Sequence, residues 1–104
     1  MPQPPPITPE QRQAALAKAA EARRVRAEVK ELLKTGSVDF AELLNRADSN
    51  DTIAGLKVEA ALAALPGMGK IKAKRLMEAN GIADNRRLRG LGERQRAALL
   101  SELG

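Results

Sequence analysis

The residues with the clearest potential for chemistry lie in one short stretch, residues 65–75. Pro66 restricts the preceding Leu65 to extended backbone angles, so a helix that enters this stretch must end there. Gly67 and Gly69 permit backbone conformations that other residues avoid, and they leave the main chain open to a ligand. A helix that starts at this turn presents unpaired N–H groups and the positive end of its dipole. The stretch therefore predicts an anion site, with phosphate as a suitable ligand.

Basic side chains follow this turn at helical spacing. Lys70 and Lys74 share one face of the predicted helix. Lys72 and Arg75 flank its other side, and Met68, between the two glycines, is predicted to pin the turn to the core. Backbone donors with lysines beside them suit nucleic-acid phosphates, which they contact without reading bases. The alternative is a plain turn between two core helices, but such a turn requires neither the second glycine nor the lysines.

A second basic stretch reads Arg86-Arg87-Leu88-Arg89-Gly90-Leu91. Leu88 and Leu91 are three residues apart and are expected to face inward. Arg86 and Arg89 have the same spacing and are expected to share a face, with Arg87 beside them. Because the stretch contains no acidic residue, these arginines are predicted to contact phosphates or a narrow minor groove. A solvated surface turn is the alternative.

The net charge of +5 is carried by the second half of the chain. Residues 1–52 contain eight basic and eight acidic side chains, whereas residues 53–104 contain ten basic and five acidic ones. This asymmetry predicts that the second half binds a polyanion. The candidate binding residues are Pro66, Gly67, Met68, Gly69, Lys70, Lys72, Lys74, Arg86, Arg87, Arg89, Arg94 and Arg96.

The composition excludes several kinds of chemistry. The chain has no Cys and no His, so it has no disulfides, no thiolate or imidazole metal ligands and no Ser–His triad. Asp48 and Asp51 are close in sequence, but we expect them at a helix start, where acids are common. The sequence therefore predicts no enzyme, no cofactor and no metal. No apolar run approaches the ~18 residues of a membrane span and no signal peptide is evident, so a cytosolic protein without a membrane partner is expected.

The hydrophobic pattern predicts an all-α fold that begins with one long helix. Residues 1–7 are proline-rich and are expected to be a disordered tail. Thr8-Pro9-Glu10-Gln11 forms a capping box, and the helix over residues 8–36 should end at Thr35-Gly36. Its apolar stripe is alanine-rich at first, so only the part from about Ala22 should dock. Charged residues near this point have two interpretations, a solvated face of ion pairs or a DNA contact, and the solvated face is preferred. The pairs would join Arg23, Arg24 and Arg26 to Glu21, Glu28 and Glu31.

The remaining residues, 37–104, are predicted to form a compact helical domain with no strand. Ser37 should cap a helix over residues 38–47 that buries Phe40, Leu43 and Leu44. A short segment starts at Ser49 or Asn50, and further helices cover residues 57–65, 69–80 and 92–103. Asn80-Gly81 is a helix stop. Gly69 and Ala73, one turn apart, should let the preceding helix approach closely. In the last helix, the residues predicted to pack are Leu99, Leu100 and Leu103.

The pattern Leu62-x-x-Leu65-Pro66-Gly67-Met68-Gly69, with Ala73 and Leu76-Met77, resembles the helix–hairpin–helix module of DNA-binding proteins. Residues 62–100 resemble its helix–two-turns–helix version, placed here at about residues 57–104, which also occurs in a small-subunit ribosomal protein. From about Thr8 onward, the chain resembles the actinobacterial integration host factor family. One departure is Gly67-Met68-Gly69 in place of the family's usual Pro-Lys-Val-Gly form, which removes a lysine at position 67.

The resemblance implies a monomeric, nucleoid-associated protein that binds, bends or compacts double-stranded DNA and assists phage site-specific integration. Phage integrase on a shared DNA site is the protein partner that it implies. In that family the turn at residues 66–70 would meet phosphates through the backbone, and Arg86, Arg87 and Arg89 would form the arginine contact. An RNA- or ribosome-binding protein is the alternative, and an enzyme acting on DNA is a third hypothesis. Phe40 alone cannot supply a stacking platform for single-stranded RNA, but duplex RNA stays open.

Overall fold

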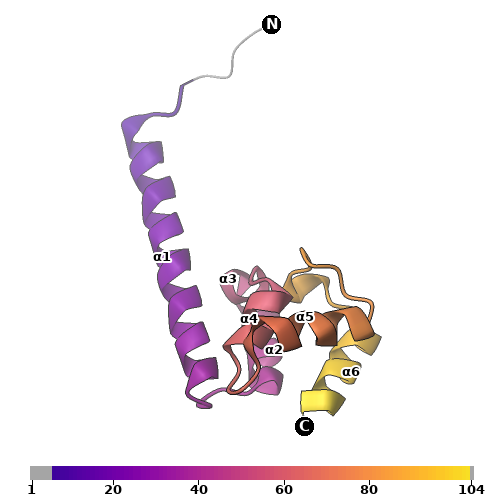
Figure 1. Ribbon diagram of the computed structural model, residues 1–104. Coiled ribbons are helices and arrows are strands. Elements are labelled where there is room, and N and C mark those ends of the chain that lie inside the picture. Colours follow the sequence, from indigo (N-terminus) through magenta and orange to yellow (C-terminus); the bar gives the residue numbers. More distant parts are fainter. Residues whose placement is uncertain (1–5, 104) are drawn as a thin grey trace, which may run out of the picture.

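The computed structural model describes residues 6–103, and within that range the protein is helical, with no strand of a sheet (Figure 1). The predicted all-α class is therefore confirmed. Most of the tail predicted at residues 1–7 lies outside the described residues. No helix in residues 6–103 is long and apolar enough to span a bilayer. The elements, in chain order, are α1 (Pro9–Lys34), α2 (Phe40–Ser49), α3 (Asp51–Ala54), α4 (Val58–Ala64), α5 (Gly69–Ala79), the 3₁₀ turn η1 (Leu88–Gly90) and α6 (Glu93–Leu103).

Helix α1 begins and ends as its local sequence predicts. The Thr8 hydroxyl accepts a hydrogen bond from the Gln11 N–H at 3.2 Å, and the Gln11 side chain accepts one from the Thr8 N–H at 3.1 Å. These two bonds form the capping box and satisfy donors that the helix cannot. After Lys34 the chain turns at Gly36, whose φ of +78° is open to glycine at little cost.

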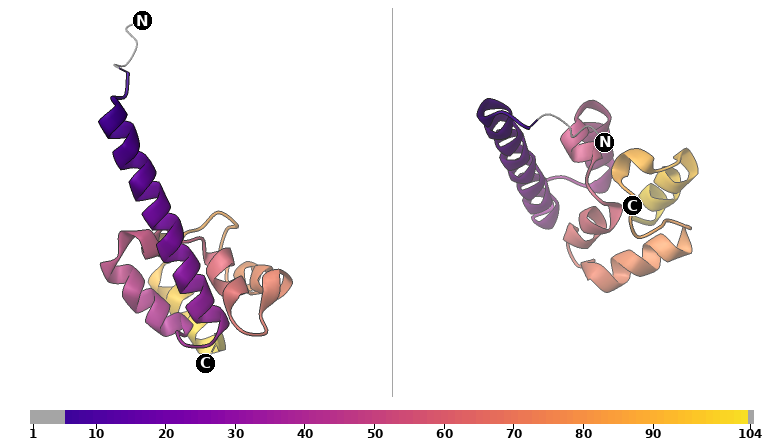
Figure 2. Two further views of the ribbon diagram at one scale, coloured as in Figure 1. Left: turned by 90° about the vertical axis from the view of Figure 1, so that its left-hand side faces the viewer. Right: turned by 90° about the horizontal axis from the view of Figure 1, so that it is seen from above.

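Only the second half of α1 docks on the rest of the molecule. Val29 and Leu33 are buried, whereas Leu16 in the first half is 61% exposed. Figures 1 and 2 show the first half extending well beyond the other helices, and the molecule measures 50 × 33 × 25 Å along its principal axes. The projection follows from the sequence, because alanines in the first turns bury too little apolar area to hold a helix against a core.

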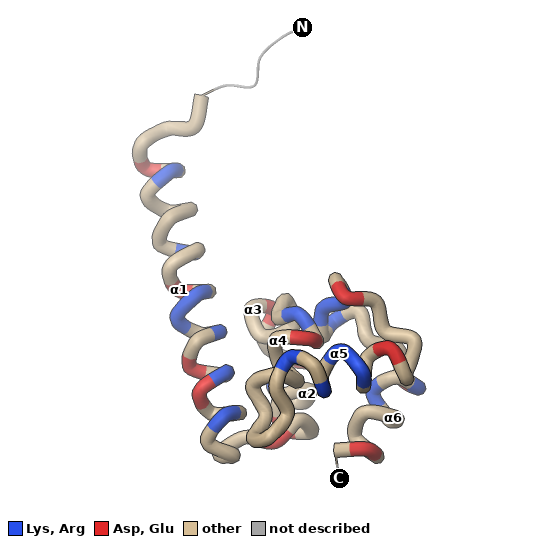
Figure 3. Tube along the Cα trace, in the orientation of Figure 1, with Lys and Arg blue, Asp and Glu red and all other residues tan. Residues whose placement is uncertain are grey.

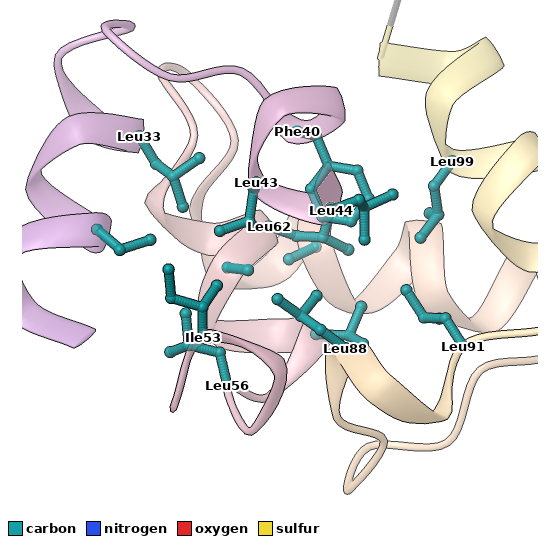
Figure 4. Packing of buried hydrophobic residues seen from close by; sticks show 14 of the residues in the cluster. Leu33, Phe40, Leu43, Leu44, Ile53, Leu56, Leu62, Leu88, Leu91 and Leu99 are labelled. Carbon is teal, nitrogen blue, oxygen red and sulfur yellow. The ribbon is translucent and has the colours of Figure 1, made fainter. Parts of the chain in front are cut away.

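The core lies among α2–α6 and the end of α1, with α4 at its centre (Figure 4). Val58, Ala61 and Leu62 of α4 are fully buried. Helix α5 packs on α4 through Ala73 and Met77, which are also fully buried. Ala73 thus allows the close approach of the two helices. Gly69 does not take part in it, because it is exposed and nothing lies within 4 Å of the position a Cβ would occupy.

Two other sequence-based expectations about this domain are wrong. Helix α2 is capped by Asp39, whose carboxylate accepts the Glu42 N–H at 2.8 Å, and it runs to Ser49. The predicted cap, Ser37, instead shares a hydrogen bond of 2.9 Å with the Thr35 hydroxyl in the preceding turn. Leu100, predicted to pack, is 36% exposed, because α6 turns Leu99 and, one turn later, the partly buried Leu103 toward the core.

Candidate nucleic-acid interface

The turn between α4 and α5 has the open main chain that the sequence predicts. Leu65 is extended, with φ −64° and ψ 146°, and Gly67 and Gly69 have φ values of +74° and +72°. Both glycines are exposed, and nothing lies within 4 Å of either Cβ position. The Met68 N–H donates to the Leu65 carbonyl at 3.1 Å, and the half-buried Met68 side chain packs against the core. The turn is therefore held to the core by Met68, while its glycine backbone is open to solvent.

Helix α5 starts at this turn with its backbone donors unused. Among residues 6–103, none of the hydrogen bonds involves the N–H of Gly69, Lys70 or Ile71. No side chain caps the helix, and its first turn contains no acidic residue. These donors and the positive end of the helix dipole can therefore satisfy an external anion.

The predicted lysines surround this helix start. Lys70, Lys72 and Lys74 are exposed, and Figure 3 shows the basic residues of α5 beginning directly after the turn. The Lys72 ammonium donates to the Gly67 carbonyl at 3.4 Å, so it lies against the turn itself. In the described part of the chain, none of the three lies within 4.0 Å of a carboxylate. Their charge is thus available to a ligand.

The second basic stretch is built differently from the cluster predicted for it. Leu88 is buried, as expected, and the segment pairs with the start of α4: Val58 N–H donates to the Arg86 carbonyl and Leu88 N–H to the Leu56 carbonyl, both at 2.9 Å. This pairing has no local sequence signature, and it fixes the backbone on both sides of Arg87.

The three arginines of this stretch have different surroundings, and none of them lies within 4.0 Å of a carboxylate among residues 6–103. Arg86 folds back to donate to the carbonyl of Gly90, and Arg87 donates to the carbonyl of Gly55. Arg89 is exposed and lines a hollow beside α2 and α6. Arg86 thus lies over Gly90, next to Arg89 in sequence, and a shared face for Arg86 and Arg89 stays a prediction.

On α6, Arg94 and Arg96 have different surroundings. Arg94 is exposed, whereas Arg96 makes a bidentate ion pair with Asp48 of α2 at 3.2–3.3 Å. The Arg96 side chain is 33% exposed and that of Asp48 60%. Asp48 lies near the end of α2 rather than at a helix start, so its role differs from the one expected. Arg96 thus already has an acidic partner, whereas no such partner of Arg94 lies within 4.0 Å among residues 6–103.

The charged residues of α1 also separate into two kinds. Arg24 pairs with Glu21 and Glu28, which lowers the pKa of Glu21, mainly through the hydrogen bond from Arg24. The interpretation as a paired, solvated face is confirmed for Arg24. Arg26 instead donates to the carbonyl of Thr52 at 3.4 Å and has no acidic partner within 4.0 Å among the described residues.

Lys30 and Lys57 line one pocket with Arg26 and Arg87, and no local sequence pattern marks either lysine as part of a site. No group of three or more Asp or Glu side chains in residues 6–103 could hold a metal ion.

This arrangement matches a known class of protein. Residues 33–103, more than half of the chain, match the family model of the S13-like H2TH domain. The fold and the turn therefore define a helix–two-turns–helix protein. An integration host factor of Streptomyces coelicolor is 53% identical over 100 residues, covering 96% of this chain and 94% of that protein. Another, from Mycobacterium tuberculosis, is 52% identical, covering 96% and 95%. The chain belongs to the integration host factor family that these actinobacterial proteins represent.

The fold agrees with a solved structure of a related protein. The structure of sIHF bound to an 8bp palindromic DNA matches with a TM-score of 0.82 and 49% sequence identity. The match covers 85% of this chain and 99% of that one.

Proposed function

We propose that the protein is an architectural, nucleoid-associated binder of double-stranded DNA in the cytoplasm. It binds as a monomer, largely without sequence specificity, through phosphate and minor-groove contacts. It bends or compacts the duplex and assists phage site-specific integration, where an integrase shares the DNA site. The observation that carries the proposal is the open start of α5, with two exposed positive-φ glycines and with backbone donors and lysines that have no partner among residues 6–103. The DNA in the related sIHF structure supports it.

The hairpin at residues 66–70 accounts for binding without sequence reading. Main-chain N–H groups at Gly69 and Lys70 can donate hydrogen bonds to a phosphate oxygen. Because every nucleotide carries the same phosphate, these bonds do not depend on the DNA sequence. Lysine adds a point charge with no fixed geometry. Arg89 and Arg94, which are both exposed, would supply a second contact, because an exposed guanidinium can enter a narrow minor groove. No catalytic step is proposed.

Salt dependence provides the first test of this function. If several phosphates are neutralised, log K should fall against log salt with a slope of about −0.9 for each contact, giving a slope of several units. Fluorescence anisotropy with a labelled mixed-sequence duplex measures it. A slope near zero would contradict phosphate binding. The same series on a matched RNA duplex tests the alternative, since tighter binding to RNA would favour an RNA- or ribosome-binding role.

Bending is tested by separating the two contacts. Smoothly bending a site costs about 1–6 kcal/mol, so it requires contacts at more than one point. We expect Arg89→Ala to reduce both bending and any preference for A·T-rich duplex. Lys70→Ala should lower affinity about equally on all sequences and leave the bend unchanged. Fluorescence transfer between the ends of A·T-rich and G·C-rich duplexes measures both. Equal bending by Arg89→Ala and the parent would place the second contact elsewhere.

A further inference from the structure

A basic pocket lies between α1, the segment joining α3 to α4, and the stretch before η1. Its volume is about 290 Å³, and it is lined by Arg26, Lys30, Gly55, Leu56, Lys57, Ala60 and Arg87. Four of these residues are cations and none is acidic. The four come from three separate parts of the sequence, so only folding brings them together. We call this the α1 pocket.

The two guanidinium groups of the α1 pocket are held by backbone carbonyls at the end of α3. Arg87 donates to the Gly55 carbonyl, and Arg26 donates through Nε to the Thr52 carbonyl at 3.4 Å. Each guanidinium carries five N–H donors, so most of them stay unused by residues 6–103. The carbonyls therefore fix the positions of both charges without neutralising them.

Gly55 has no side chain, and the Arg26 guanidinium lies directly beside it. Its φ of −81° is accessible to any residue, so the backbone does not require glycine here. A side chain here would instead meet Arg26, because a Cβ would lie 3.0 Å from its Nη2, which is a tight contact. The glycine therefore leaves room for the Arg26 guanidinium, and a methyl group at this position would shift that group by a few tenths of an ångström.

The charges in the α1 pocket have no acidic counterpart. Among the described residues, no carboxylate lies within 4.0 Å of Arg26, Lys30, Lys57 or Arg87. Arg24, only two residues from Arg26 on the same helix, is paired with Glu21 and Glu28. Four converging cations repel one another, and an anion with several oxygens relieves that repulsion. The fork of each arginine matches the oxygens of a phosphate.

We propose that the α1 pocket binds a backbone phosphate of the DNA duplex, as a contact separate from the hairpin. The proposal rests on the proposed function and adds α1 to the interface. Lys57 immediately precedes α4, and the hairpin follows its last residue, Ala64. A helix of seven residues is about 10 Å long. That span is within the roughly 12 Å width of a major groove, so one duplex can supply phosphates to both contacts.

The test compares two arginines on the same helix. Arg26→Gln and the control Arg24→Gln remove the same charge, two residues apart, but only Arg26 lines the pocket. In a salt series on a mixed-sequence duplex, Arg26→Gln should weaken binding and reduce the slope of log K against log salt by about 0.9. Lys57→Gln should do the same, and Arg24→Gln should keep the parent slope. Gly55→Ala changes no charge, but it should also weaken binding, because the added methyl group displaces the Arg26 guanidinium.

The outcomes distinguish this inference from the proposed function. If the parent protein shows no salt-dependent DNA binding, the proposed function fails. If the parent binds but Arg26→Gln and Lys57→Gln keep the slope of Arg24→Gln, only the α1 pocket is wrong. Backbone amide shifts of Gly55 and Leu56 during titration with the duplex, and separately with inorganic phosphate, identify the source of the anion. Shifts with inorganic phosphate but none with the duplex would overturn the proposal.

Discussion

Replacing Gly69 by glutamate is expected to lower duplex affinity by well over tenfold while the protein stays helical. The new carboxylate would enter open space at the start of α5, because nothing lies within 4 Å of the Cβ position of Gly69. It would occupy the place proposed for a phosphate, repel the DNA and satisfy the helix dipole itself. Anisotropy gives the affinity, and far-ultraviolet circular dichroism gives the helical content.

A matched control separates the charge from backbone strain. Gly81, at the other end of α5, has φ +64° and equally open space around its Cβ position. Gly81→Glu thus introduces the same charge and a similar strain, about 1–2 kcal/mol for a left-handed residue, but away from the hairpin. We expect it to bind nearly like the parent protein. If Gly69→Glu and Gly81→Glu bind equally well, the hairpin does not hold a phosphate.

Replacing Leu62 by alanine is expected to have the largest effect on stability. Leu62 is 0% exposed at the centre of α4, and a buried Leu→Ala change costs about 2–5 kcal/mol. Small domains are stable by only about 5–15 kcal/mol in total. Because each kcal/mol corresponds to roughly 4–8 °C at this size, the Tm should fall by about 10 °C or more. Thermal unfolding followed by circular dichroism measures the shift.

The control for Leu62→Ala is Ile71→Ala, on the neighbouring helix. Ile71 is 70% exposed, so its truncation removes little packing and should change stability by at most about 0.5 kcal/mol. Equal losses of Tm in the two variants would mean that α4 is not the centre of the core.

Features with a local cause could be predicted from the sequence. The Thr8 capping box, the glycine turn after Lys34 and the positive φ of Gly67, Gly69 and Gly81 each depend on neighbouring residues alone. The hairpin part of the candidate site belongs to this group, because its donors are main-chain atoms whose exposure follows from Pro66 and the two glycines. The predicted cap of α2 was wrong although a cap is a local feature, since Ser37 and Asp39 are both good caps and the sequence does not distinguish them.

Features set by distant carbonyls and carboxylates could not be predicted. Arg87 binds a carbonyl 32 residues away, Arg26 one 26 residues away, and Arg96 pairs with a carboxylate 48 residues away. Nothing near these arginines in the sequence indicates which of them is paired and which is free. Lys57 was missed for the same reason, because its neighbours in the α1 pocket come from other elements.

Because its first half projects from the domain, α1 consists of two segments that differ in how strongly the helical state is favoured over the coil. Residues 9–18 bury no side chain, so their helical state depends on the Thr8 cap and on alanine propensity. Free helices shorter than about 12–15 residues are marginal in water, so these turns are expected to fray from the N-terminus without disturbing the core. Fraying stops where Val29 and Leu33 pack, close to Arg26 and Lys30. A ligand held by those two side chains therefore binds at the boundary between the segments, and it extends the cooperative unit toward the N-terminus.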